Sequence, residues 1–395
     1  MMADDTALQR ARVTIKVIGI GGGGNNVLAR MAQSDFIHAQ NIEDIELVAI
    51  NTEARQLSML EGTGIVCLQI GEQVTQGRGT GGSVEAGEAA AKADEAKIKN
   101  AITGADIVFI TGALGGGTGT GAVPTVARIA KDLGILTVGV VTLPFAFEGS
   151  RKTRFAKQGI QAMQGYMDAL LAIHNDNLMK MPENRKITLV QAFKLADSVL
   201  EQAIRCIAEL ILKTGVINVD FADVTTIFTQ SESSDALLGI GLADDAASAV
   251  EEAVKSPLLE KSLKGARGVI LNLTGDANMS LYDVDNATKF ICEQTDPNVN
   301  IILGTVIDED MKGRVQATII ATDFAGSTAI KAPKLDVPQS KLQKPKGFEL
   351  SAPSFMERPK APQVPEPPEA PKPAAPKEAF AIPAFRITPP TGEKK

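Results

Sequence analysis

The sequence predicts an α/β protein in which a parallel sheet carrying a ligand site is joined, through one long helix, to a second and mixed α/β domain. Over the first half of the chain, short apolar runs typical of buried strands alternate with helical patterns. Glycine-rich loops follow several of these strands. Because the carboxyl ends of parallel strands meet at one edge of a sheet, we expect the ligand to bind at that edge.

The composition limits the class of protein. A chain of 395 residues is long enough for two or three domains, and its net charge of −7 predicts no basic surface for nucleic acid. The cysteines, Cys67, Cys206 and Cys292, are widely spaced in apolar runs, which indicates reduced core residues rather than a disulfide framework or a metal site. Residues 1–12 are polar and expected to be flexible, and no apolar run is long enough to cross a bilayer. We therefore expect a soluble, cytoplasmic protein that does not insert into the membrane.

The strongest ligand signal is the segment Gly112–Gly121, between a predicted strand over Ile107–Thr111 and a predicted helix over Ala122–Leu133. Each glycine costs roughly 0.5 to 1 kcal/mol relative to alanine, so folding alone explains this cluster poorly. Bare backbone N–H groups at a helix N-terminus suit a phosphate, and Thr118 and Thr120 could add hydroxyl donors. The alternative, a flexible surface loop, is disfavoured because the segment sits tightly between a strand and a helix.

Two further glycine clusters widen this site. Gly19–Gly24 leads into a predicted helix over Val27–Gln33, and its spacing also matches the dinucleotide-binding fingerprint of an oxidoreductase, with Glu53 as the ribose ligand. Gly77–Gly82 opens a predicted helix over Val84–Ala101. Three loops point to one extended anionic ligand, most simply a triphosphate, whereas a dinucleotide has no use for all three. The GxxxxGK[ST] pattern of a P-loop is absent from the sequence, so backbone amides must hold the phosphates.

Candidates for contacts with the rest of a nucleotide lie further along the chain. Glu148, after a predicted strand over Leu136–Thr142, could accept a hydrogen bond from a ribose hydroxyl or be an ordinary turn residue. A helix is predicted over Leu189–Leu212, roughly 36 Å long at 1.5 Å per residue. On it, Phe193 and Asp197 lie one turn apart, where a ring could stack on a purine and a carboxylate could accept from guanine. Core packing is the alternative, and it is stronger for Phe193, since a carboxylate in an apolar helix needs a partner.

Asn218, Asp220 and Asp223 follow the long helix, before a predicted strand over Thr225–Thr229. Two carboxylates three residues apart beside an amide could polarise a water or bind a metal, or could cap a helix and a strand end. Spacing alone leaves both open. His174, after a predicted strand, is interpreted as a loop residue rather than a general base, because no nucleophile pairs with it in the sequence.

The last third of the chain changes character. Strands over Arg267–Leu273, Asn300–Ile307 and Arg314–Ala321 indicate a second, mixed α/β domain without a catalytic constellation. Fifteen of the twenty prolines lie after Ile330, so residues 331–379 are predicted to be a disordered linker. The apolar island Phe380–Ile387 is expected to dock into a partner's groove.

Taken together, these features resemble the FtsZ family, the bacterial tubulin-like cell-division GTPases. The resemblance covers about Val13 to Thr322 and the terminal peptide, and its most specific motifs are Gly115–Gly121, similar to the tubulin-family signature, and Asn218–Asp223, similar to the family's synergy loop. It implies a GTP-binding domain over residues 13–188, a central helix over 189–214, a C-terminal α/β domain over 215–330 and a partner-binding tail over 380–395. It also implies a GTPase that binds GTP, GDP and Mg²⁺. The chain would polymerise head to tail into the cytokinetic ring at mid-cell, beneath the inner membrane.

The resemblance also assigns roles to individual residues. From the first loop, the nucleotide would be contacted by Gly22, Gly23, Gly24, Asn25 and Asn26. Its phosphates would be bound by Gly117, Thr118 and Gly119. Glu148 would bind the ribose, and guanine would contact Phe193 and Asp197. Asp220 and Asp223, with Asn218, would act on the nucleotide of the next subunit, so that the hydrolytic site exists only in a polymer. The tail around Ile382–Phe385 would bind membrane-tethering and regulatory division proteins.

Two residues depart from the family's pattern. Lys152 stands where arginine is usual, four residues after Glu148. Lysine keeps the charge but lacks the planar fork of arginine, so we expect weaker contact at that edge of the nucleotide. Asn25 stands where glycine is common, which we expect to tighten the first turn.

Overall fold

The computed structural model describes residues 13–34, 45–181, 184, 186–212, 217, 219–231 and 233–324. The predicted flexible N-terminus, the linker over 331–379, the tail over 380–395 and Asn218 lie outside the described residues. Ten strands are present in the described part: β1 (Ile15–Ile20), β2 (Ile45–Asn51), β3 (Val66–Gln69), β4 (Ile107–Ala113), β5 (Leu136–Leu143), β6 (Ala169–His174), β7 (Asp235–Ala243), β8 (Ala266–Gly275), β9 (Asn300–Ile307) and β10 (Val315–Phe324).

The helices alternate with these strands as predicted for an α/β fold. They are α2 (Gly21–Met31), α4 (Ala54–Ser58), α5 (Glu72–Thr75), α6 (Val84–Ala93), α7 (Glu95–Ile102), α8 (Gly117–Asp132), α9 (Ser150–Met163), α10 (Asn175–Leu178), α11 (Leu189–Leu212), α12 (Phe221–Thr229), α13 (Ala246–Lys255) and α14 (Leu281–Gln294), with short 3₁₀ turns η1 (Ala146–Glu148), η2 (Gln164–Tyr166) and η4 (Glu309–Met311). Among the described helices, none combines the length and apolar character needed to span a bilayer.

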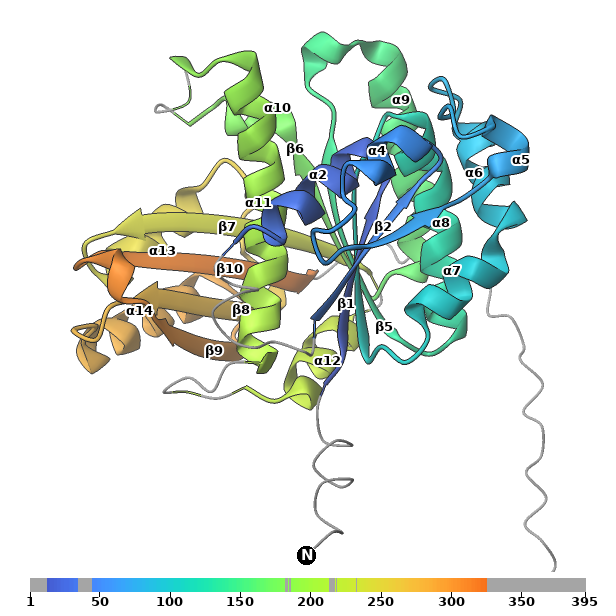
Figure 1. Ribbon diagram of the computed structural model, residues 1–395. Helices are drawn as coiled ribbons and strands as arrows, with labels where there is room; N and C mark the ends of the chain where they lie inside the picture. Colours follow the sequence, from blue (N-terminus) through green and yellow to red (C-terminus); the bar gives the residue numbers. More distant parts are fainter. Residues whose placement is uncertain are drawn as a thin grey trace, which may run out of the picture. The chain divides into compact units, whose positions relative to one another are not determined.

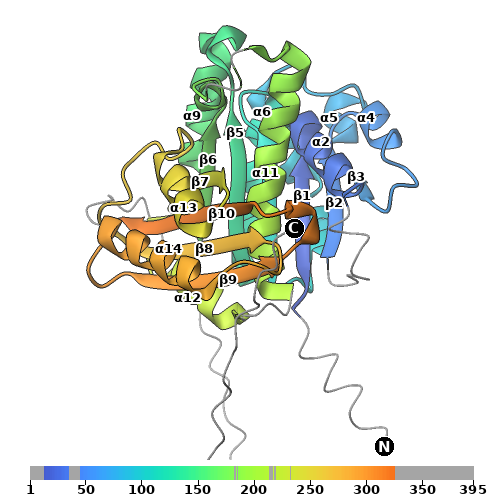
Figure 2. The ribbon, with the colours of Figure 1, turned by 90° about the vertical axis from the view of Figure 1, so that its left-hand side faces the viewer.

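The sheet consists of two parts that meet at a short junction. Its strand order is β3-β2-β1-β4-β5-β6-β7-β10-β8-β9, and β1 to β6 are all parallel. Strand β7 pairs with β6 through only two residue pairs, Leu170 with Asp235 and Leu171 with Ala236. Beyond it, β10 runs antiparallel between β7 and β8. Figures 1 and 2 show β7 to β10 crossing the direction of β1 to β6, so the second part is a separate layer around its own core.

Alternating side chains along the strands divide the interior into layers. On β4, Ile107 and Phe109 face the cluster that holds α2, α11 and α12, whereas Val108 and Ile110 face the cluster of α6, α7 and α8. This period of two is what a sheet covered on both faces requires. A third cluster packs α13 and α14 on β8 and β10. Helix α11 lies between the two parts of the sheet (Figure 1), and its buried side chains join both.

The predicted long helix over Leu189–Leu212 is confirmed, but the predicted strand over Thr225–Thr229 is wrong. That segment belongs to α12, whose first N–H groups are capped by Asp220: its Oδ1 accepts from the backbone N of Asp223 at 2.8 Å. The hydroxyls of the three threonines donate to carbonyls four residues earlier, which suits a helix. Their β-branched side chains favoured a strand in the sequence, and the cap decided otherwise.

Other predicted boundaries shift for local reasons. The helix predicted over Val84–Ala101 is divided into α6 and α7 at Asp94, whose Oδ2 accepts from the backbone N of Gly71 at 2.7 Å. Strand β7 was not among the predicted strands. Cys206 is a core residue as predicted, but Cys67 is only half-buried and Cys292 is exposed on α14.

The glycine loops are themselves the first turns of helices, since α2 begins at Gly21 and α8 at Gly117. Several of these glycines are also required by packing. A Cβ on Gly24 would lie 2.5 Å from the carbonyl oxygen of Thr111, and one on Gly121 would lie 2.1 Å from the carbonyl oxygen of Val84. Folding therefore explains part of the glycine content that the sequence pattern attributes to the ligand.

We predict that Gly121→Ala lowers the free energy of unfolding of the nucleotide-free protein. The new methyl group would meet the backbone of α6 at Val84 and Glu88, which cannot move without displacing the helix. Overpacking of this kind costs about 1–3 kcal/mol. Urea denaturation measures the change. Gly134→Ala, at an exposed turn with no atom within 4 Å of the added Cβ, controls for the loss of glycine, although its positive φ adds some strain.

Candidate functional site

A cavity of about 580 Å³ opens at the carboxyl edge of β1, β2, β4, β5 and β6. Its size is that of a small-molecule site. Its walls come from the three glycine clusters, from the ends of the parallel strands and from the first turns of α11. They include Gly21, Gly22, Gly23, Asn26, Gly79, Gly81, Gly82, Gly116, Gly117, Thr118, Gly119, Glu148, Lys152, Phe193 and Asp197. The structure thus brings the predicted loops and both candidate residues of the long helix to one place.

Two helix N-termini open into the cavity without caps. The residues before α2 and α8, Ile20 and Gly116, make no side-chain capping hydrogen bond, and neither helix has an acidic residue in its first turn. The first N–H groups of a helix lack intrahelical acceptors, and the helix dipole adds partial positive charge there. With Arg78 and Lys152 also on the wall, this end of the cavity suits a polyphosphate.

Buried polar contacts fix the two helix ends relative to the sheet. The hydroxyls of Thr52 and Thr118 lie 2.7 Å apart and join the end of β2 to α8. Asn51 Nδ2 donates to Asn25 Oδ1 at 2.6 Å and joins β2 to α2. Asn51 Oδ1 accepts from the backbone N of Thr52 and of Glu53, which shapes the turn that follows the strand. These side-chain contacts therefore hold the phosphate end of the cavity in shape before a ligand binds.

The first loop lines the cavity with Gly22, Gly23 and Asn26, while Gly24 and Asn25 lie buried beside them, so their expected contact with the nucleotide stays a prediction. Gly24 packs on β4, and Asn25 Nδ2 donates to the carbonyl oxygen of Gly19 at 3.1 Å. Both residues are buried behind the loop. Gly24 and Asn25 hold the first loop in shape, Gly24 through backbone packing on β4 and Asn25 through its side-chain hydrogen bond to Gly19.

The far wall of the cavity is aromatic and carries one half-buried acid, Asp197. Phe193 stands edge-on to Phe145, with ring centroids 5.5 Å apart, and remains 39% exposed toward the cavity. One turn later, burial raises the pKa of Asp197 to about 6, and the positive charge of Arg30 only partly opposes this. A carboxylate held in such a place gains from a partner with N–H donors, and guanine offers two on one edge.

Glu148 and Lys152 lie on the cavity wall and form an ion pair. Lys152 Nζ donates to Glu148 Oε2 at 2.9 Å, and Glu148 Oε1 accepts from the backbone N of Phe145 at 3.0 Å. A carboxylate has about four acceptor positions, so Glu148 can still accept from a ribose hydroxyl. The lysine at this position thus neutralises the carboxylate rather than presenting a planar fork to the ligand.

Sequence reasoning missed several residues of the wall, namely Asn51, Gln56, Arg78, Thr142 and Asn175. Asn175 is the most informative, because it is 4% exposed and, in the described part of the chain, its Oδ1 has no hydrogen-bond partner. A buried amide without a partner beside a cavity indicates a ligand contact. Its signal in the sequence was a polar residue immediately after a predicted parallel strand.

Asp220 and Asp223 lie far from this cavity. They begin α12, both are exposed, and α12 lies beyond the opposite end of α11 from α2 and α10 (Figure 1). Asp220 is a helix cap, one of the two roles that spacing left open. His174 ends β6, and its Nε2 lies 3.5 Å from the carboxylate oxygen Oε1 of Glu260.

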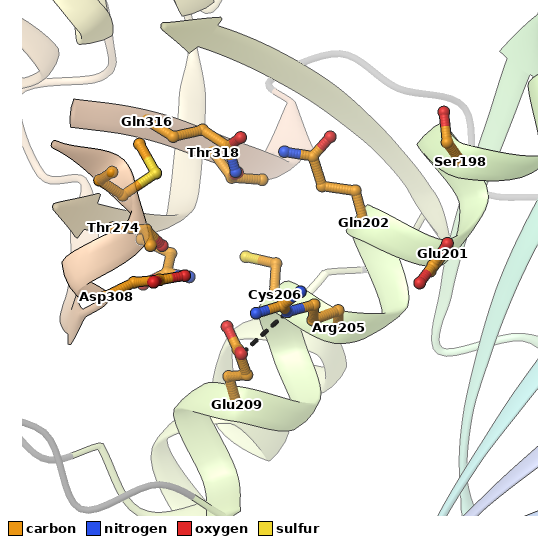
Figure 3. A pocket seen from close by; sticks show the side chains of 12 residues that line it. Ser198, Glu201, Gln202, Arg205, Cys206, Glu209, Thr274, Asp308, Gln316 and Thr318 are labelled. Atoms are coloured by element: carbon orange, nitrogen blue, oxygen red, sulfur yellow. Dashed lines mark hydrogen bonds and ion pairs between the residues drawn. The ribbon is translucent and has the colours of Figure 1, made fainter. Parts of the chain in front are cut away.

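A second cavity, of about 250 Å³, lies between α11 and strands β8 and β10. Figure 3 shows Arg205 and Glu209 paired along α11, with Cys206 on the same helix pointing into the gap and Thr318 across it. No glycine cluster and no uncapped helix N-terminus among the described residues borders this space. It therefore lacks the phosphate-binding features of the first cavity.

Comparison with known proteins identifies the family. The sequence model of the Tubulin/FtsZ family, GTPase domain, matches residues 14–183, and that of the FtsZ family, C-terminal domain, matches residues 234–325. The chain belongs to the FtsZ family. A solved FtsZ dimer from M. jannaschii is 38% identical, with a TM-score of 0.73 over 82% of this chain and 92% of that one. CetZ2 from Haloferax volcanii, solved as a GTPγS-bound protofilament, is 20% identical and has a TM-score of 0.67 over 80% of this chain and 95% of that one, which shows the shared fold.

Membership of the FtsZ family decides between the ligands that spacing left open. The chain has the tubulin-like α/β fold and is a GTPase, which binds GTP and GDP rather than a dinucleotide. Of the cavities described above, the one at the sheet edge carries the phosphate-binding features that GTP requires.

We predict that Gly116→Ala weakens GTP binding without unfolding the protein. Gly116 has an ordinary φ of −84°, and an added Cβ would meet no protein atom within 4 Å, so the fold tolerates it. The methyl group would instead occupy space beside the phosphates. We expect the Kd for GDP to rise by about tenfold, which corresponds to roughly 1.4 kcal/mol. Titration with a fluorescent GDP analogue measures this, and an unchanged melting temperature separates the effect from that of Gly121→Ala.

We also predict that GDP affinity falls about tenfold between pH 7 and pH 5, because the ionised fraction of Asp197 falls by that factor when its pKa is about 6. Asp197→Asn should bind GDP weakly and show no such pH dependence.

Since burial raises the pKa of Asp197 above its unfolded value, the ionised group destabilises the nucleotide-free fold at pH values above about 6. Asp197→Asn should therefore melt at a higher temperature at pH 7.5. Equal pH dependence of GDP affinity in the unaltered protein and in Asp197→Asn would contradict the assignment of Asp197 to guanine binding.

Proposed function

We propose that this FtsZ-family GTPase assembles head to tail into filaments of the cytokinetic ring at the bacterial division site and hydrolyses GTP between subunits. The observation that carries the proposal is the separation of two halves of a site. The nucleotide cavity lies at one end of α11 and the exposed carboxylates of Asp220 and Asp223 lie beyond the other.

The length of α11 prevents the two halves from meeting within one molecule. A helix of 24 residues is roughly 36 Å long at 1.5 Å per residue. Side chains from Ala196 to Leu210 are buried in the core that joins the two parts of the sheet, so the helix cannot fold back. The carboxylates can therefore reach a nucleotide only on another subunit. Contact between two different ends of the same chain is heterologous and propagates as an open filament.

Exposed apolar side chains lie in both parts of the fold. At the nucleotide end, Phe147 is 64% exposed, and Leu189 and Val190 at the start of α11 are exposed as well. On the second part of the sheet, Leu281 and Tyr282 are exposed at the start of α14. Exposed large apolar side chains that gather at a surface mark interaction sites, and a second copy of the chain would cover both sets. The M. jannaschii and Haloferax relatives were solved as a dimer and as a protofilament.

In the proposed contact, catalysis is mainly positioning and charge stabilisation. The backbone amides of α2 and α8 hold the phosphates, while Asp220, Asp223 and Asn218 of the neighbouring subunit orient and polarise the attacking water. Within the subunit that binds the nucleotide, Glu148 accepts from the ribose and Phe193 and Asp197 bind guanine. Gly22, Gly23, Asn26, Gly117, Thr118 and Gly119 line the phosphate end.

We propose that Mg²⁺ accompanies the nucleotide. Mg²⁺ at phosphate-transfer sites is usually bound by one or two carboxylates together with substrate phosphates. No group of three His, Cys, Asp or Glu side chains that could hold a metal occurs in the described part of the chain. Glu53 lines the cavity beside Gly79 and fits an ion held mainly by the phosphates. The ion would neutralise phosphate charge.

The remaining elements of the proposal concern the cell. We propose a GTP-binding domain over residues 13–188, a central helix over 189–214 and a C-terminal domain over 215–330. A linker over 331–379 would carry the tail peptide around Ile382–Phe385 to membrane-tethering and regulatory division proteins. The protein would work in the cytoplasm, beneath the inner membrane at mid-cell, without inserting into it.

We predict that Asp220→Asn keeps GDP affinity and lowers GTP turnover by at least about a hundredfold, within the range expected for loss of a positioned polar group. Asparagine caps helices as well as aspartate does, so α12 should stay folded, whereas alanine would also lose the cap. Phosphate release measures turnover, and the rate per subunit of the unaltered protein should rise with protein concentration. A rate independent of concentration would contradict hydrolysis between subunits.

Mixing two inactive variants tests the shared site directly. Asp220→Asn retains the cavity, and Asp197→Ala retains the carboxylates at the other end. Contacts in which the first protein supplies the cavity and the second supplies Asp220 should restore part of the turnover. If the mixture stays inactive although both proteins enter one sedimenting polymer, the site is not shared between subunits.

A further inference from the structure

Helix α10 is a single turn of four residues that face different parts of the molecule. Asn175 lines the nucleotide cavity. Asp176 Oδ1 accepts from the backbone N of Ala146 at 3.0 Å and thereby holds η1, the turn that carries Glu148. Leu178 is buried in the main core. A turn this short has no stability of its own, so its orientation depends on contacts with the rest of the protein.

Asn177, the third residue of α10, is 6% exposed and is held at both ends of its amide. Its Nδ2 donates to Glu260 Oε1 at 2.7 Å, and its Oδ1 accepts from Lys180 Nζ at 2.6 Å. Glu260 Oε1 is also the atom that pairs with His174 Nε2, immediately before α10. The Glu260 carboxylate thus contacts both α10 and the end of β6.

Glu260 belongs to the second part of the fold, in the segment between α13 and β8. Leu258 and Leu263, on either side of it, are buried, the first in the main core and the second in the core of α13 and α14. This anchoring ties the backbone around Glu260 to both cores, whereas Glu260 itself is exposed. A hydrogen bond to a charged acceptor is about twice as strong as one between neutral groups.

We propose that Glu260 is a positioning residue for nucleotide binding, which holds α10 so that the unpartnered Oδ1 of Asn175 faces the nucleotide. The inference rests on the proposed binding of GTP in this cavity. It makes the α13–β8 segment a determinant of nucleotide affinity, although no atom of that segment lines the cavity. Without the carboxylate, α10 would keep the contacts of Asp176 and Leu178 but lose its hydrogen bond to Glu260, so the Oδ1 of Asn175 would be held less firmly toward the nucleotide.

The test measures GDP affinity of the full chain with a fluorescent analogue. Glu260→Ala should raise the Kd by about three- to tenfold, the range expected for residues coupled within one network. In an Asn175→Ala background, Glu260→Ala should raise the Kd no further, because its effect passes through Asn175. Glu260→Gln retains the Oε1 acceptor for Asn177 and should stay close to the unaltered protein. Glu251→Ala, which removes an exposed carboxylate paired with Lys255 on α13, should leave the Kd unchanged.

An unchanged Kd for Glu260→Ala would overturn the proposal, and so would an equal increase in both backgrounds. If Glu260→Ala does not fold, Asn177→Ala removes the same hydrogen bond from the other side. Its effect on the Kd for GDP is then compared in the unaltered and Asn175→Ala backgrounds, with the same outcomes expected. Phe193→Ala separates failures of the two proposals. If it weakens binding while Glu260→Ala does not, the cavity binds GDP and only the positioning role is lost. If neither Phe193→Ala nor Asn175→Ala has an effect, the cavity itself is misassigned.

Discussion

The structure depends on bringing two helix N-termini together at one edge of a parallel sheet without a side chain to cap either. A Cβ on Gly21, at a φ of +69°, would lie 3.1 Å from the backbone N of Gly119, so the first turns of α2 and α8 nearly touch. Their first N–H groups have partial positive charge, and both first turns line the cavity. Such an arrangement is unfavourable in an empty protein and favourable once phosphates occupy it. Nucleotide binding thus satisfies donors that the fold leaves open.

Helix α11 links the end of the molecule that carries the nucleotide cavity to the end that carries Asp220 and Asp223. Its first turns supply Phe193 and Asp197, and near its other end Leu210 packs so closely on β9 that a Cβ on Gly304 would lie 1.8 Å from Leu210 Cδ2. The helix is thus held by buried side chains from Ala196 to Leu210, whereas Leu189 and Val190 in its first turn are exposed. A rigid spacer fixes the distance between cavity and carboxylates, and this distance would become the repeat of a filament.

The part of the site that could be predicted was the part with local patterns. Phe193 and Asp197 were found because helical spacing places them on one face, and the glycine clusters because they follow strands. Asn175 and Gln56 gave weaker signals, since a single polar residue after a strand gains meaning only when the strand order is known. The strand predicted at Thr225 failed because a single hydrogen bond from the cap outweighed the preference of three threonines.

Individual hydrogen bonds between distant residues could not be predicted from local patterns, and the bond between Asn177 and Glu260 spans 83 positions. If Glu260 positions α10 as proposed, this contact would let the second part of the fold influence a nucleotide that it does not touch. The segments around the base and ribose, α10 and η1, are single turns held by side chains. A short element costs little to reorient, so one carboxylate is enough to bias it. Helices α2 and α8 differ from these turns, because close backbone packing at their glycines fixes their orientation. By this proposal the phosphate end is set by backbone packing, whereas the end expected to bind the base and ribose would respond to the second part of the fold.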